Sequence, residues 1–246
     1  MTSYAFPPGG LPDQSTSPES TAVFTPAYAV IPASVQRDIV TSFLPEWRDS
    51  RAWVLARPLT GFAETFSQYA LEIAPGGGSA RPEPDKAAQG VLFVAVGTAR
   101  LTIGEAEHDL RPGSYAYLPP ASDWSLFTTG DTPCKLHWIR KRYTPVSGLD
   151  MPPALVTHEK DVPQVAMPHT DGAWATQRFV EPTDLRHDMH VNIVTFQPGG
   201  LIPFAETHVM EHGLALVGKA GRSVGHQPLP LRGADGSTKI GLARQA

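Results

Sequence analysis

The sequence predicts an all-β protein in which a unit of short strands occurs twice. Its 246 residues include 22 Gly and 25 Pro, and this punctuation argues against long helices. Apolar segments of strand length recur between closely spaced turn signals, a pattern typical of a β-barrel or β-sandwich. In addition, 71–77 and 193–200 share one layout, an apolar strand followed by Pro-Gly-Gly, at a separation of about 120 residues. An internal duplication explains this match.

The first half is expected to contain most of the strands. Apolar runs or alternating patterns predict strands at 51–56, 64–73, 91–96, 99–103, 115–118 and 135–143. The continuous apolar run 91–96 is expected to be a buried strand that ends at Gly97. Pro75-Gly76-Gly77-Gly78 is expected to stop the strand 64–73.

The second half begins after a linker rich in Pro and Gly at about 144–153. Strands are expected within 164–179, at 189–196, and from Leu214 to Val217. We therefore divide the chain into four parts. These are a flexible N-terminal arm at 1–24, a first barrel at 25–145, a second and partial barrel at 146–217, and an irregular tail at 218–246.

Composition excludes several classes of function. A net charge of −4 and a pI near 6.1 give no reason to expect nucleic acid or an anionic membrane as a partner. The cluster Arg140-Lys141-Arg142 is expected to be a solvated strand end. Cys134 is the only cysteine, so no intrachain disulfide forms, and we expect it to fill space in a strand. No secretory signal is visible in Met1–Ser20 and no apolar run is long enough to span a membrane, so we expect a cytoplasmic protein.

The segment Glu206-Thr207-His208-Val209-Met210-Glu211-His212-Gly213 predicts a metal site. It combines two imidazoles and a carboxylate directly after the turn Pro198-Gly199-Gly200. In a strand, Glu206 and His208 share one face because side chains alternate. His212 joins them only if the chain bends, and Gly213 eases such a bend. Two imidazoles with a carboxylate suit Mn²⁺ or Zn²⁺, and no thiolate biases the site toward zinc.

Two other interpretations remain open for this segment. A helix would place His208 and His212 on one face, as in zinc proteases, but those enzymes require HExxH and this sequence reads His-Val-Met-Glu-His. Alternatively, the histidines and glutamates belong to a solvated loop. Glu211 either orients a ligand or carries a proton beside the site, or it faces solvent as an ordinary glutamate next to a turn.

The strand, the Pro-Gly-Gly turn, the Glu-x-His-x3-His motif and their repetition resemble a bicupin, which consists of two tandem cupin β-barrels. Within bicupins the chain is similar to the (S)-ureidoglycine aminohydrolase family of purine (allantoin) catabolism. Four segments carry the resemblance, at 113–120, 141–148, 184–189 and 206–213. Most cupins have a His-x-His motif with a later Glu where this chain has Glu206, His208 and His212.

The resemblance implies hydrolysis of a small ureido substrate, (S)-ureidoglycine, to (S)-ureidoglycolate and ammonia. It implies Mn²⁺ held by Glu206, His208 and His212, with Glu206 also available for proton transfer, and assembly as a homo-oligomer. The first barrel departs from a metal-binding cupin, because its turn is followed by Glu83 without a histidine and Trp124 occupies a later histidine's position. We therefore expect that barrel to be structural.

The tail also departs from the family, whose members continue through further strands. Residues 218–246 instead carry a net charge of +4 and no aromatic residue. We expect a truncated or frame-shifted C-terminus and an incomplete second barrel. The competing hypothesis is a non-catalytic cupin that serves as a binding or assembly module.

Overall fold

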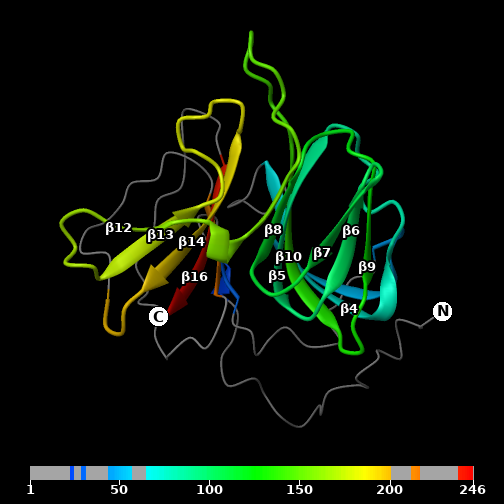
Figure 1. The fold of residues 1–246 in the computed structure, drawn as a ribbon, viewed down its shortest axis with the longest axis horizontal. Helices are drawn as coiled ribbons and strands as arrows, with labels where there is room; N and C mark the ends of the chain where they lie inside the picture. The colour runs from blue at the N-terminus through cyan, green and yellow to red at the C-terminus, as the bar shows by residue number, and fades with distance from the viewer. Residues whose placement is uncertain are drawn as a thin grey trace.

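The computed structural model describes residues 23–24, 29–31, 44–56, 65–200, 212–216 and 238–245, and these form an all-β fold (Figure 1). A nine-stranded sheet and a five-stranded sheet contain most of them, and a two-stranded ribbon, β1 (Val23–Phe24) with β2 (Ala29–Val30), makes a third. No helix in this described part of the chain has the length and apolar character needed to cross a membrane.

The nine-stranded sheet curls around an apolar interior as a cupin-type barrel. Its strand order is β11-β8-β5-β10-β4-β9-β6-β7, and β3 pairs with β4. The strands are β3 (Arg48–Ala56), β4 (Phe66–Ser79), β5 (Ala88–Val96), β6 (Ala99–Ile103), β7 (Ala106–Leu110), β8 (Ser114–Leu118), β9 (Trp124–Thr128), β10 (Cys134–Arg142) and β11 (Leu155–His158). Every strand expected in the first half is present.

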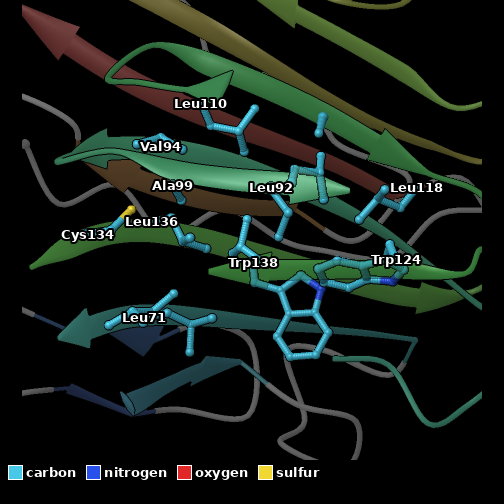
Figure 2. Packing of buried hydrophobic residues seen from close by; sticks show 14 of the residues in the cluster. Leu71, Leu92, Val94, Ala99, Leu110, Leu118, Trp124, Cys134, Leu136 and Trp138 are labelled. Carbon is cyan, nitrogen blue, oxygen red and sulfur yellow. The ribbon is translucent and has the colours of Figure 1, made fainter. Parts of the chain in front are cut away.

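Strand β5 shows why its sequence is an unbroken apolar run. Leu92 and Val94 point into the barrel, where Figure 2 shows them among the other interior side chains. Val91 and Phe93 belong to a second apolar cluster on the outer face of the same strand. Since successive side chains of a strand alternate between faces, a strand covered on both sides needs apolar residues at every position.

The turn signal at Pro75-Gly76-Gly77-Gly78 does not stop the strand before it, which corrects the sequence prediction. Strand β4 continues to Ser79, and it changes partner from β10 to β9, where Gly78 pairs with Phe127. Gly76 and Gly78 have φ of +74° and +144°, which permit the bend without breaking the strand.

The second sheet has the order β12-β13-β14-β16-β15. Its strands are β12 (Gln164–Ala166), β13 (Trp174–Arg178), β14 (Met189–Phe196), β15 (His212–Leu216) and β16 (Thr238–Gln245), and the 3₁₀ turn η3 (Glu159–Asp161) precedes it. Strand β16 pairs parallel with both β14 and β15. Because part of the segment joining these strands lies outside the described residues, a second closed barrel stays a prediction.

Two strands depart from the expected division of the chain. Strand β11 pairs with β8, so the first barrel's sheet extends beyond residue 145. Strand β16 lies within 218–246, which was expected to be irregular throughout. A local reason for β16 is visible in the sequence, where Ile240 and Leu242 alternate with Lys239 and Gly241.

The two Pro-Gly-Gly turns have closely related geometry, which supports the internal duplication. Gly76 and Gly199 have φ of +74° and +76°. At the next residue, a Cβ on Gly77 would lie 2.8 Å from the Asp49 carbonyl oxygen, and a Cβ on Gly200 would lie 2.3 Å from the Ala173 carbonyl oxygen. Each turn therefore needs one glycine for its φ and a second for close contact with a neighbouring chain segment.

The two sheets pack face to face (Figure 1). Phe179, Met189, Val191 and Ile193 from the second half contact the outer face of β5, β8 and β10 through one apolar cluster. Phe179 stacks on Tyr115 with ring centroids 4.1 Å apart. The second sheet is therefore tied to the first barrel through a buried apolar interface.

Candidate functional site

The predicted metal ligands lie mostly outside the described residues. Glu206, His208 and Glu211 fall there, so their assignments stay predictions. The turn that leads toward them is described. The Gly200 N–H donates to the Gln197 carbonyl oxygen at 2.8 Å, and the Gln197 N–H donates to the Ala173 carbonyl oxygen at 3.0 Å. The first bond closes the turn, and the second connects the end of β14 to the start of β13.

His212 is the first residue of strand β15. The register aligns it with Lys239 of β16, which in turn aligns with His190 of β14. At a strand spacing of about 4.8 Å, the main chains of His212 and His190 are roughly 10 Å apart. A helix that carried both His208 and His212 would have to contain this position, so the strand disfavours the helical protease hypothesis.

Two histidines, His187 and His190, precede the turn and are not among the predicted ligands. The His187 ring packs edge-on against Tyr117 at 4.8 Å between centroids, and its Nε2 lies 3.9 Å from Asp184 Oδ2. Burial lowers the His187 pKa, and Asp184 opposes this effect. The rings of His187 and His190 are 6.5 Å apart. Within the described ranges, no three His, Cys, Asp or Glu residues are arranged to hold a metal ion.

Aromatic residues and an ion pair occupy the positions of the first barrel at which a metal-binding cupin would have ligands. Trp124 is 6% exposed and makes edge contacts with Trp47 and Trp138, whose centroids lie 6.5 and 6.1 Å away. Figure 2 shows Trp124 beside Trp138 in the barrel interior. Glu83 is bound by Arg140, whose Nε donates to Glu83 Oε2 at 2.6 Å. This carboxylate is therefore already neutralised by a guanidinium.

The basic cluster on β10 is not a solvated strand end, which corrects the sequence analysis. Arg140 pairs with Glu83, and the Lys141 side chain is only 3% exposed and pairs with Asp188 of the second half. Arg142 alone behaves as expected, with a side chain 77% exposed beside Asp85. The alternation along β10 places Lys141 on the outer barrel face with Ile139, but only the packing of the second sheet buries it.

Asp188 is the centre of a polar network between the two sheets. Its Oδ1 accepts a hydrogen bond from Gln89 Nε2, and its Oδ2 accepts from Lys141 Nζ and, at 2.9 Å, from the Thr144 N–H. Gln89 Oε1 in turn accepts from the Tyr117 hydroxyl at 3.1 Å. Burial, together with the Asp188 charge, raises the pKa of Tyr117, so that its hydroxyl stays protonated.

This network was not predicted from the sequence. Lys141 and Asp188 both lie in segments that carry the family resemblance, at 141–148 and 184–189, and the structure brings these two segments together. The available signal was a lysine on the outer face of a strand, at a position with apolar neighbours. No local pattern identifies its partner, since Asp188 is 47 residues away.

A family model described as a cupin domain matches residues 70–140, within the barrel. The fold and this match show that the first barrel is a cupin domain. A crystal structure of a putative glyoxylate-induced protein from Pseudomonas aeruginosa is 55% identical, with a TM-score of 0.73, and the match covers 79% of this chain and 73% of that chain. A crystal structure of protein Ylba from E. coli has the same fold at 22% identity and a TM-score of 0.67, over 78% of this chain and 74% of that one.

Proteins named for an activity also match. The chain is 31% identical to a probable (S)-ureidoglycine aminohydrolase from Oryza sativa subsp. japonica over 179 residues, 72% of this chain and 55% of the rice protein. It is 24% identical to the (S)-ureidoglycine aminohydrolase of Escherichia coli (strain K12) over 74% of this chain and 68% of that protein. This chain belongs to the same family as the putative glyoxylate-induced protein of Pseudomonas aeruginosa, and it is similar to the (S)-ureidoglycine aminohydrolases. It spans just over half the length of the rice protein.

Proposed function

We propose that this chain hydrolyses (S)-ureidoglycine to (S)-ureidoglycolate and ammonia with the help of a divalent metal ion, Mn²⁺ by preference. The observation that carries the proposal is the match over 179 residues to a protein named for this activity. Strand β15 adds support, since it begins at the predicted ligand His212, as the strand interpretation of the site expects.

The donor set fits the proposed ion. Glu206 supplies a carboxylate oxygen, and His208 and His212 supply neutral imidazole nitrogens, which together suit Mn²⁺ or Zn²⁺. When bound, such an ion supplies Lewis-acid polarisation of the substrate and activation of water. In the reaction the bond between carbon and the leaving amine breaks, a carbon–oxygen bond to water forms, and one proton passes from the water to the departing ammonia.

The protein would contribute charge and proton transfer. Glu206 would balance the charge of the ion. Either Glu206 or Glu211, both of which are close to the histidines in the sequence, would accept a proton from water and return it to the leaving amine. We also propose, on the family resemblance, that the chain acts as a homo-oligomer. Size measured by light scattering tests that part separately.

The deciding experiment measures ammonia release from (S)-ureidoglycine by the purified chain with added Mn²⁺, against the rate without protein. We expect release that depends on the metal and disappears in Glu206→Ala. A folded chain that binds Mn²⁺ and releases no ammonia above background would contradict the proposal.

A non-catalytic cupin is the second candidate. It is favoured by the first barrel, in which Trp124, Trp138 and the Glu83–Arg140 pair fill the interior and its rim. In this chain a cupin barrel therefore already serves as a scaffold. The same ammonia assay separates the two candidates, because a scaffold predicts no release at any metal concentration.

A further inference from the structure

The carboxylate of Asp188 joins the first barrel to the strand that begins the second sheet. Asp188 immediately precedes Met189, the first residue of β14. The three groups that donate hydrogen bonds to its carboxylate belong to Gln89, Lys141 and Thr144, which all lie in the barrel half. The side chain of Asp188 is 12% exposed and that of Lys141 is 3% exposed. A charge pair so little hydrated holds its geometry firmly, because separating the partners leaves each charge buried without compensation.

The rest of the interface is apolar and does not determine a unique placement. Met189, Val191 and Ile193 alternate along β14 and contact the barrel face through the shared apolar cluster. Dispersion and burial are largely non-directional, so a shift of β14 along the barrel would exchange one apolar contact for another. Hydrogen bonds to both oxygens of one carboxylate are directional, and they select one placement.

The selected placement extends to the predicted metal site. His190, two residues after Asp188, aligns with Lys239 of β16 and through it with His212 of β15. These strands are joined by continuous parallel pairing, from Met189 with Thr238 to Phe196 with Gln245. A displacement of the start of β14 therefore moves the main chain at His212 with it.

We propose that Asp188 is a positioning residue, whose buried carboxylate fixes β14, and with it the strand that begins at His212, against the first barrel. The consequence for metal binding rests on the proposed function. Asp188 acts through the strands and touches neither the ion nor the substrate. Lys141 is its principal partner, and Gln89, itself held by the Tyr117 hydroxyl at 3.1 Å, keeps the second oxygen in place.

The test compares three variants at a temperature at which all of them are folded. Asp188→Asn keeps the side-chain size and removes the charge. Asp109→Asn makes the same chemical change in the exposed pair with Arg100, where the side chains are 77% and 46% exposed. Leu101→Ala removes a fully buried side chain from the barrel interior, away from the junction, and is expected to lower the thermal midpoint by an amount similar to Asp188→Asn, on the order of 10 °C.

The first readout is amide hydrogen exchange. In Asp188→Asn we expect faster exchange across β14, β16 and β15, with β6 and β9 unchanged. In Leu101→Ala we expect faster exchange in β6 and β9, with β14, β16 and β15 unchanged. Asp109→Asn is expected to match the wild type in all of these strands. Equal protection of β14 and β16 in Asp188→Asn and wild type would overturn the proposal, whatever the chain catalyses.

The second readout is the affinity for Mn²⁺ alone, measured by calorimetry. Asp188→Asn is expected to bind the ion about tenfold more weakly or worse, since a misplacement of about 1 Å at a functional site is costly, while Leu101→Ala is expected to bind as the wild type does. If Asp188→Asn and Leu101→Ala weaken Mn²⁺ binding equally, Asp188 contributes only to general stability and the positioning role is wrong. A wild type that binds no Mn²⁺ would refute the proposed function, and hydrogen exchange would then decide the role of Asp188 by itself.

Discussion

Replacing Gly78 with alanine is expected to disrupt the first barrel, whereas the same change at Gly76 is expected to be mild. A Cβ on Gly78 would lie 2.1 Å from the Leu126 carbonyl oxygen and 2.7 Å from Phe127 Cα, both backbone atoms of β9. Normal contact would require the two strands to separate by more than an ångström, yet Gly78 and Phe127 are paired in the sheet. The φ of +144° adds strain for any side chain.

Gly76 is a matched control because it also has a positive φ, +74°, but a Cβ there would meet no atom within 4 Å. Only the left-handed conformation opposes alanine at Gly76, at a cost of about 1–2 kcal/mol. At Gly78 the lost β4–β9 pairing and the displaced core are added, and we expect a loss above about 4 kcal/mol.

The assay is thermal or urea unfolding followed by circular dichroism. For a chain of this size about 1 kcal/mol lowers the midpoint by roughly 2–4 °C, so Gly76→Ala should lower it by several degrees. Gly78→Ala should lower it by more than about 8 °C or prevent folding. If the two variants unfold at the same midpoint, the proposed close contact between β4 and β9 is wrong.

Three further predictions concern metal, acid and packing. Glu206→Ala or His208→Ala is expected to abolish Mn²⁺ binding, and full occupancy by elemental analysis in either variant would refute the ligand assignment. Burial lowers the pKa of His137 to about 4, from an unfolded value near 6.5, so the unfolded state binds the extra proton and stability falls as pH drops from about 6.5 to 4. His137→Leu should remove about 1–3 kcal/mol of this acid-induced loss in the free energy of unfolding, measured with urea at pH 7 and pH 4.5. If the free energy of unfolding falls by the same amount between the two pH values in the variant and the wild type, the lowered pKa of His137 is wrong. Leu126→Ala should lose about 2–5 kcal/mol, because the side chain is fully buried, while Val54→Ala, at a position 37% exposed, should lose much less.

The strands of the first barrel were predictable because each depends on a local pattern. Apolar residues on both faces of β5 and turn signals at Gly97 and Gly104 determine where those strands begin and end. The same reasoning failed at Pro75-Gly76-Gly77-Gly78, where the glycines bend β4 and allow it to change partner. A turn signal and a bent strand use the same residues, so the local sequence does not distinguish them.

The candidate site stays a prediction from the sequence, and the structure describes only the strand that begins at His212. The spacing of Glu206, His208 and His212 indicates ligands, and the strand at His212 agrees with the preferred interpretation. The alignment of His212 with His190 through Lys239 could not be predicted, because strand register depends on pairing between distant segments.

By itself the sequence determined the all-β class and the repetition of a strand followed by Pro-Gly-Gly, since each is recorded in spacing along the chain. Only the tertiary structure decided that β16 lies between β14 and β15, and that Lys141 is buried against Asp188. The physical reason is that a strand's pattern states which side chains share a face, whereas the atoms that cover that face come from elsewhere in the chain.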